Sequence, residues 1–323
     1  MTILVTGGCG LVGSFAVREA LARGAAVAAF DLALKTELLA DVRDKVTLVQ
    51  GNVLHAPDLF RAARELKVTR ILHTASFLTP GAYARPYANA ELTIMGTLNV
   101  LECARAMGIE RVSYVSTGKT GWTGAAFSKT LDSGRFDIAA DPYASAKVGA
   151  ELLANDYRQL YDLDVRILRL GGQVYGPGYA FAGAIGQGLQ PFIEKPLNGE
   201  PVRYDQPVLA HSAPIIPMLY GADAGRGCMA ATLAGDLPHV VYDINAPIAS
   251  TLYQVVEVIK TLIPGADIDV PPAPTEAGPF RAGPITPDPR AQADFGYLPE
   301  YDLERGLREY IAFLRSGRYG VAA

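Results

Sequence analysis

The chain has 323 residues, of which 50% are hydrophobic and 19% are charged, and its formal net charge is -4 at pH 7. This balance is typical of a compact folded enzyme and excludes a disordered or fibrous chain. Lysine and arginine form no cluster in the sequence, so we expect no nucleic-acid partner.

The three cysteines are too few and too widely separated for a disulfide framework, and no Cys or His pair has metal-ligand spacing. We therefore expect no metal. No segment approaches the ~20 apolar residues of a membrane span, and the first residues lack the pattern of a signal peptide. These features predict no membrane partner and a cytoplasmic location.

Strand-like and helix-like segments alternate from the first residue. Short apolar runs predict strands at 3–5, 27–30, 46–49, 70–75, 112–116 and 165–170. Helical periodicity predicts one helix after the first strand, ending near Gly24, and further helices at about 58–67, 91–107 and 143–160. This alternation is typical of βαβ units. The predicted fold class is α/β, a doubly wound parallel-sheet Rossmann domain.

The pattern changes after about residue 171. Glycine and alanine are frequent over 171–188 and prolines recur over 191–217, which predicts loops and short elements. A strand at 240–244 is expected to rejoin the main sheet, with helices near 251–262 and 302–315. The sequence thus predicts a Rossmann domain at 1–170 plus about 217–245, and a smaller C-terminal lobe at 171–216 plus about 246–323.

A glycine-rich turn follows the first predicted strand. Gly7, Gly10 and Gly13 have the spacing G-x-x-G-x-x-G and open a helix. Such glycines let the backbone turn sharply and approach a pyrophosphate, whose charge then lies on the helix N-terminus. A purely structural turn is the alternative, but the strand-turn-helix context favours dinucleotide binding.

Asp31 ends the second predicted strand, 18 positions after Gly13. A carboxylate there accepts hydrogen bonds from both hydroxyls of an adenosine ribose and repels a 2′-phosphate. No Arg or Lys follows within three residues, so NAD is favoured over NADP as the cofactor. A helix N-cap is the alternative role for this aspartate.

Tyr143 and Lys147 stand at i and i+4, on one face of a predicted helix that Pro142 begins. A phenol with a pKa near 10 is almost fully protonated at neutral pH and so is not a useful base, and a nearby cation is expected to lower that pKa. Tyr143 can then remove a proton from a substrate hydroxyl as hydride leaves the same carbon. Alone, Y-x-x-x-K is a common chance match, and an exposed surface pair is its usual explanation. The pattern indicates a catalytic pair only because a dinucleotide-binding glycine loop precedes it in the chain.

Over nearly its whole length the sequence resembles the extended short-chain dehydrogenase/reductases, also called the NAD-dependent epimerase/dehydratase family. The resemblance rests on T-G-G-x-G-x-x-G at 6–13, His73-Thr74-Ala75-Ser76, Gly96-Thr97-Leu98-Asn99-Val100-Leu101, Val115-Ser116-Thr117, Tyr143 with Lys147, Tyr175-Gly176-Pro177-Gly178, and Phe295-Gly296-Tyr297-Leu298-Pro299. It implies an NAD-dependent enzyme whose Rossmann domain binds NAD and whose smaller lobe binds a small-molecule substrate.

The resemblance also implies roles for individual residues. The Thr117 hydroxyl is expected to hydrogen-bond the reacting oxygen, with Ser116 as the alternative, so the predicted catalytic residues are Thr117, Tyr143 and Lys147. The cofactor is expected to contact Gly7, Gly10, Leu11, Val12, Gly13, Asp31, Asn52, Val53, Thr74, Ala75, Ser76, Thr93, Ser116, Tyr143, Lys147 and Leu170. The substrate is expected to contact Ser76, Thr117, Gly118, Tyr143 and Gln173.

Several positions depart from the family pattern. Gly118-Lys119 replaces the Asp-Glu pair of the family's dehydratases, which argues against elimination chemistry. Sugar-nucleotide enzymes of the family usually carry an Arg-Asp pair in the stretch that here reads Ala213-Pro214-Ile215-Ile216-Pro217-Met218. A substrate diphosphate without a guanidinium partner is poorly compensated. Arg203 or Lys195 is a possible substitute, although neither stands in the expected place. His211 and Arg203 are also possible substrate contacts, and an ordinary loop position is the alternative for each.

Three functions therefore remain open. The first is a dehydrogenase of a small polyhydroxy, sugar-acid or hydroxy-acid-like substrate. The second is a sugar-nucleotide 4-epimerase, which tightly retained NAD would favour. The third is a non-catalytic NAD-binding sensor or scaffold. The resemblance also implies a homodimer through the helices near 91–107 and 143–160.

Overall fold

The computed structural model describes residues 1–121, 141–178, 184–203, 216–247, 249–270 and 286–316. For residues 184–190 and 216, and for Pro80, Lys119 and Gly121, only the backbone is described. Among the described residues no helix is long and apolar enough to cross a membrane.

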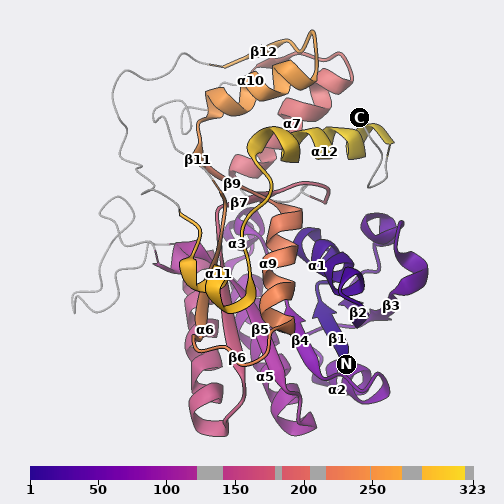
Figure 1. Cartoon of the computed structure of the whole chain (residues 1–323), viewed down its shortest axis with the longest axis vertical. Coiled ribbons are helices and arrows are strands. Elements are labelled where there is room, and N and C mark those ends of the chain that lie inside the picture. Colours follow the sequence, from indigo (N-terminus) through magenta and orange to yellow (C-terminus); the bar gives the residue numbers. More distant parts are fainter. Residues whose placement is uncertain (122–140, 179–183, 204–215, 248, 271–285, 317–323) are drawn as a thin grey trace, which may run out of the picture.

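The centre of the molecule is a parallel sheet of seven strands (Figure 1). Its order is β10-β6-β5-β4-β1-β2-β3, and every neighbouring pair is parallel. The strands are β1 (Thr2–Thr6), β2 (Ala26–Asp31), β3 (Thr47–Gln50), β4 (Arg70–His73), β5 (Arg111–Thr117), β6 (Val165–Gly171) and β10 (Val241–Asn245). The expected return of a strand at 240–244 to the main sheet is confirmed by β10, which pairs with β6.

Helices cover both faces of this sheet, as a doubly wound fold requires. One face packs against α1 (Leu11–Ala22), α9 (Gly221–Leu233) and α11 (Pro289–Phe295), and the other against α2 (Ala56–Glu65), α5 (Gly96–Met107) and α6 (Pro142–Tyr161). The central strands are mostly buried because helices cover both faces of the sheet, whereas the edge strand β3 is partly exposed. The predicted fold class is confirmed.

Helix α9 was not predicted, because its glycines are poor helix formers. The same glycines let α9 approach α1 closely. A Cβ on Gly225 would lie 2.6 Å from the backbone nitrogen of Ala16, and one on Gly221 would lie 2.4 Å from the Phe15 ring. Tertiary packing therefore overrides the local preference here.

Several short helical elements connect the strands and main helices of this domain. They are η1 (Thr36–Leu39), η2 (Arg43–Lys45), α3 (Thr79–Ala84), α4 (Pro86–Ala90), the π-helical turn η3 (Glu91–Met95) and η4 (Gly118–Gly121). The helix expected at 91–107 is thus a π turn continued by α5, and Gly108 ends it with φ +65°.

A second hydrophobic core lies among the remaining elements, and α7, α10 and α12 gather at one end of the molecule (Figure 1). These elements are β7 (Gln173–Tyr175), α7 (Ala184–Leu197), β8 (Val202–Arg203), β9 (Ile216–Tyr220), β11 (Ala249–Ser250), α10 (Leu252–Leu262), β12 (Ile268–Asp269) and α12 (Leu303–Ser316). They form two small sheets, ordered β11-β9-β7 and β12-β8. The division of the chain into two functional domains stays a prediction.

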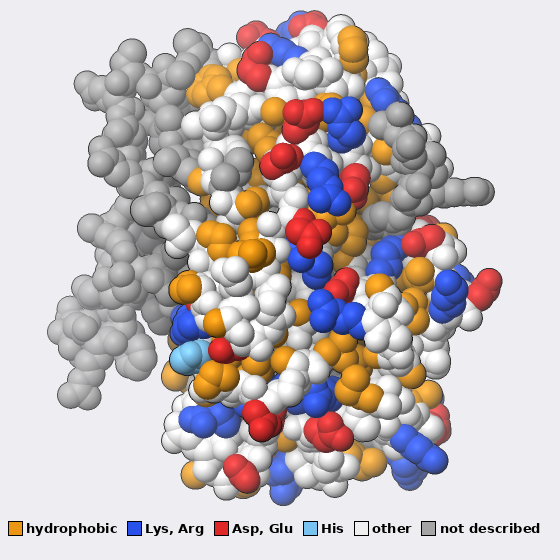
Figure 2. Space-filling model, in the orientation of Figure 1, with side chains coloured by type: hydrophobic (Ala, Val, Ile, Leu, Met, Phe, Trp, Pro, Cys, Tyr) orange, Lys and Arg blue, Asp and Glu red, His pale blue; other side chains and the backbone are white. Residues whose placement is uncertain are grey.

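Charged side chains of both signs are interspersed over the face seen in Figure 2. On this face no broad area of basic side chains stands out among the described residues.

Candidate active site

The predicted site residues gather where the strands of the main sheet end. The glycine loop follows β1, Asp31 ends β2, Thr74 follows β4 and Thr117 ends β5. Ligands of open α/β sheets bind at this carboxyl edge.

The glycine loop is built as a close backbone turn. Gly7 has φ +69°, a left-handed conformation that glycine adopts readily, and its N–H donates to the Phe30 carbonyl at 2.8 Å. A Cβ on Gly13 would lie 2.1 Å from the Gly7 carbonyl oxygen, so no larger residue fits that position. Gly10 precedes α1 and, within the described chain, no side chain caps this helix start.

These features fit a dinucleotide. The first-turn amide groups of a helix have no intrahelical partner and carry partial positive charge. Leu11, Val12 and Gly13 supply such amides in the first turn of α1, and the tight turn would let a pyrophosphate approach them. Their contact with the cofactor stays a prediction.

Asp31 lies beside the glycine loop. Its Oδ2 accepts the Cys9 N–H at 3.0 Å, and its Oδ1 accepts the Ala33 N–H at 3.3 Å. The alternative role as a helix N-cap is wrong, because the next helical turn, η1, begins at Thr36 and is preceded by Lys35. The carboxylate therefore joins β2 to the glycine loop, where a ribose-binding acid belongs.

Two more predicted cofactor residues lie against the loop. The Thr74 hydroxyl donates to the Thr6 carbonyl at 2.7 Å, and it would lie 2.7 Å from a Cβ on Gly7. The Ala75 nitrogen would be 2.9 Å from the same point. The structure brings these residues together, although they are far apart in the sequence.

Asn52, Val53, Thr93 and Leu170 have mainly internal contacts. The Asn52 Oδ1 accepts the Leu54 N–H at 2.9 Å, and Val53 is buried against Gly96. Thr93 is buried, and its hydroxyl contacts the Asn89 amide oxygen at 3.5 Å. Leu170 is buried in β6. Their proposed contact with the cofactor stays a prediction.

Tyr143 and Lys147 lie on α6, which begins where the sequence predicts. The Asp141 carboxylate caps this helix by accepting the Tyr143 N–H at 2.8 Å and the Ala144 N–H at 3.3 Å, with Pro142 in the first turn. The Thr117 hydroxyl hydrogen-bonds the Tyr143 phenol. Lys147 is buried, and its ammonium donates to the Val115 carbonyl at 2.8 Å.

The electrostatics of this pair differ from the expectation. Burial, and then the Asp141 carboxylate, raise the pKa of Tyr143 to about 12, and the Thr117 hydrogen bond acts in the opposite direction. Burial lowers the pKa of Lys147 to about 7 against the attraction of Glu151. The Lys147 nitrogen lies 5.9 Å from the Tyr143 ring centre. Desolvation of the Tyr143 phenol therefore raises its pKa, whereas the nearby Lys147 cation was expected to lower it.

Ser116 and Thr117 point to different partners. The buried Ser116 hydroxyl donates to Glu151 Oε1 at 2.5 Å, whereas Thr117 contacts Tyr143. This arrangement favours Thr117 over Ser116 for contact with a reacting oxygen. Sequence reasoning did not single out Glu151 or Asp141, because an acid on a helix is usually solvent-exposed.

The remaining predicted substrate residues lie near the same edge. Gly118 begins η4 directly after Thr117, and Gln173 is half-buried in β7. The Ser76 hydroxyl donates to the Phe77 carbonyl at 3.0 Å.

Other residues considered from the sequence have structural partners or lie outside the described residues. His73 is buried between the Thr6 and Thr97 hydroxyls at 2.6 and 3.2 Å, and burial lowers its pKa to about 3, so it is neutral. Arg203 is exposed and paired with Asp267 at 2.6 Å. His211 lies outside the described residues. No cluster of potential metal ligands occurs in the described ranges.

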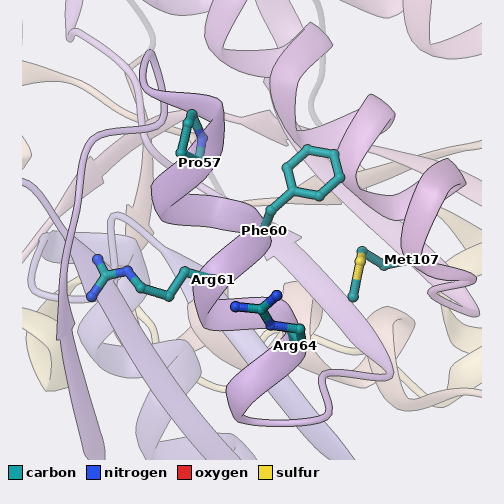
Figure 3. A pocket seen from close by; sticks show the side chains of 5 residues that line it. All are labelled: Pro57, Phe60, Arg61, Arg64 and Met107. Carbon is teal, nitrogen blue, oxygen red and sulfur yellow. The ribbon is translucent and has the colours of Figure 1, made fainter.

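A surface hollow of about 260 Å³ lies away from this site. It is lined by Pro57, Phe60, Arg61 and Arg64 of α2 and by Met107 at the end of α5 (Figure 3). Met107 lies just before the amino end of β5, whereas Thr117 ends that strand at the carboxyl edge. The hollow is therefore separate from the chemistry of Tyr143.

Comparison with known proteins gives a consistent family match. The NAD dependent epimerase/dehydratase family matches residues 3–244. A UDP-glucose 4-epimerase of Mycolicibacterium smegmatis is 33% identical over 183 residues, which cover 55% of this chain and 57% of the relative.

Solved structures match over nearly the full chain. A Thermotoga maritima UDP-glucose 4-epimerase, solved with UDP-glucose, has a TM-score of 0.79 at 25% identity and covers 98% of this chain and 99% of its own. A Thermus thermophilus UDP-glucose 4-epimerase, solved with NAD, has a TM-score of 0.75 at 25% identity with the same coverage.

Proposed function

Because the chain belongs to the NAD-dependent epimerase/dehydratase family and is an enzyme that uses NAD, we propose that it oxidises or reduces a hydroxyl-bearing carbon of a small substrate. The substrate class is a polyhydroxy compound, sugar acid or hydroxy acid without a nucleotide.

The observation that carries this choice of substrate is the sequence at 213–218. It contains no arginine where the family's sugar-nucleotide enzymes place one. The described arginines that flank this stretch in sequence both have acidic partners. Arg203 contacts Asp267 at 2.8 and 2.6 Å. Arg226 contacts Glu300 at 2.6 Å and Asp223 at 2.5 Å. The expected substrate residues are instead uncharged side chains that form hydrogen bonds, which suit a compact ligand. They are Ser76, Thr117, Tyr143 and Gln173.

The proposed chemistry divides between cofactor and protein. NAD, when bound, accepts or returns a hydride. The glycine loop and Asp31 would hold the dinucleotide, and Lys147, one turn after Tyr143 on α6, would contact the nicotinamide ribose. Tyr143 carries the proton of the substrate hydroxyl, and Thr117 stabilises its phenolate by donating a hydrogen bond. The raised pKa of Tyr143 keeps the phenol protonated at neutral pH, as a proton donor requires.

A sugar-nucleotide 4-epimerase is the second candidate. It is favoured by the relatives, because those named above are UDP-glucose 4-epimerases. The same Tyr143 and Thr117 serve either reaction, so the difference lies in whether a nucleotide diphosphate binds.

We expect UDP and UDP-sugars to bind the NAD-loaded protein in the millimolar range or not at all, as measured by calorimetry. A charge-assisted contact with phosphate contributes about 1.5–3 kcal/mol, which is roughly a ten- to hundredfold change in affinity. Micromolar UDP binding would overturn the proposed substrate class and establish the epimerase as the better candidate.

We expect Asp31→Ala to weaken NAD binding about ten- to hundredfold and to narrow the preference for NAD over NADP. The variant loses the acceptor for the ribose hydroxyls and the charge that repels a 2′-phosphate. Calorimetry with both cofactors measures this, and Asp44→Ala in the exposed turn η2 is the control. A wild-type protein that binds NADP as tightly as NAD would refute the assignment.

We also propose that the elements around the second core form the substrate-binding lobe, and that the chain forms a homodimer. Exposed apolar side chains on α6 and the adjoining η3 support the dimer, because such residues are usually covered in an assembly. They are Met95, Leu152, Leu160 and Tyr161.

A further inference from the structure

Glu151 is a buried carboxylate on the helix that carries Tyr143 and Lys147. It lies one turn after Lys147, and its side chain is only 8% exposed. Its Oε1 contacts the Ser116 hydroxyl at 2.5 Å, the Thr120 hydroxyl at 3.1 Å and the Arg169 Nε at 3.1 Å. Its Oε2 accepts the Arg169 Nη2 at 2.6 Å. The chemistry proposed above uses none of these contacts.

The partners of Glu151 stand on both sides of Thr117. Ser116 precedes it in β5, and Thr120 follows it in η4 and also contacts the Thr117 carbonyl at 2.8 Å. Arg169 is the register partner of Ser116 in the neighbouring strand β6. A single carboxylate thus joins α6 to the chain segment on either side of Thr117.

We propose that Glu151 is a positioning residue that holds the Thr117 hydroxyl within hydrogen-bonding distance of Tyr143. The inference rests on the proposed function only in that these two hydroxyls face the substrate. Tyr143 is fixed on α6 by its helix, whereas Thr117 ends a strand and continues into a short turn. A contact from α6 to both sides of Thr117 therefore sets the separation of the two groups.

The geometry explains why a carboxylate suits this position. Burying a charge is costly unless it is paired and hydrogen-bonded, and Glu151 has a guanidinium and two hydroxyls as partners. Glu151→Gln keeps the size of the side chain but loses the charge and leaves Arg169 without its ion pair. A misplacement near 1 Å at a reacting group can lower turnover about 100-fold. We expect a ten- to hundredfold loss in turnover, with NAD affinity close to that of the wild type.

The decisive experiment needs no substrate. The full chain, loaded with NAD and containing tyrosine labelled with carbon-13 at Cζ, is studied by NMR, and the Tyr143 resonance is identified by its loss in Tyr143→Phe. We expect Glu151→Gln to move this resonance in the same direction as Thr117→Val. In the double variant Glu151→Gln/Thr117→Val, we expect no further shift, because both changes remove the same hydrogen bond.

Glu304→Gln is the matched control, because it removes an exposed Glu–Arg pair on α12 and should leave Tyr143 unchanged. Ser116→Ala removes one of the Glu151 contacts without a change of charge. This variant replaces Glu151→Gln in the experiment if Glu151→Gln does not fold. Ser116→Ala should give a smaller shift of the same sign. An unmoved Tyr143 resonance, or shifts that add independently in the double variant, would overturn the proposal. A coupled shift together with undiminished turnover of Tyr143→Phe would instead refute the proposed function alone.

Discussion

Replacing Tyr143 by phenylalanine should lower turnover about 10²- to 10⁴-fold while NAD affinity stays close to that of the wild type. Only the phenol oxygen is lost, and proton transfer by a positioned side chain typically contributes a factor of this size. The ring remains in place on α6, so the fold should persist. Steady-state kinetics with the best substrate found for the wild type, together with calorimetry of NAD binding, measure the two quantities.

Tyr161→Phe is the control for this change, because Tyr161 is an exposed tyrosine at the end of the same helix. Its turnover should equal that of the wild type. A loss below about tenfold in Tyr143→Phe would mean that another group carries the proton.

Gly13→Ala should weaken NAD binding at least about tenfold and also lower the thermal stability. The new Cβ would lie 2.1 Å from the Gly7 carbonyl oxygen and 2.8 Å from the Gly8 Cα. These are backbone atoms, so relief requires a shift of the turn that is expected to hold the pyrophosphate. Overpacking of this kind costs about 1–3 kcal/mol.

Calorimetry with NAD and a thermal unfolding curve measure the effects of Gly13→Ala. Gly235→Ala is the matched control, because nothing lies within 4 Å of a Cβ at that position. NAD affinity unchanged in Gly13→Ala would show that the loop does not hold the cofactor.

The main sheet could be predicted from the sequence because its strands are short apolar runs separated by helical periodicity. The helix α6 was equally clear, since Pro142 and the apolar spacing both mark it. In contrast, α9 contains Gly221, Gly225 and Gly227, and only its close packing against other elements makes a helix favourable there. Two-residue strands such as β8 and β12 give no periodic signal at all.

Part of the candidate site could also be predicted from local patterns in the sequence. Gly7, Asp31, Tyr143 and Lys147 have local spacings with a physical reason, so residue patterns identify them. Thr117 came from the family resemblance, because no local pattern links it to a tyrosine 26 positions later.

The contacts of Glu151 and the desolvation of the Tyr143 phenol could not be predicted from the sequence. Glu151 stands eight residues after Tyr143 on the same helix, where a glutamate is usually exposed to solvent. Its burial follows from the packing of α6 against β5 and β6, which the sequence does not define. The raised pKa of Tyr143 also depends on burial, which only the assembled structure defines.

The most direct test of the account is a screen of the wild type and Tyr143→Phe with NAD against hydroxy acids, polyols, sugars and UDP-sugars, followed by NADH absorbance. We expect the wild type to form NADH with at least one compound that lacks a nucleotide, and Tyr143→Phe to lose almost all of that signal. Turnover of UDP-sugars alone, or an equal signal from Tyr143→Phe, would contradict it.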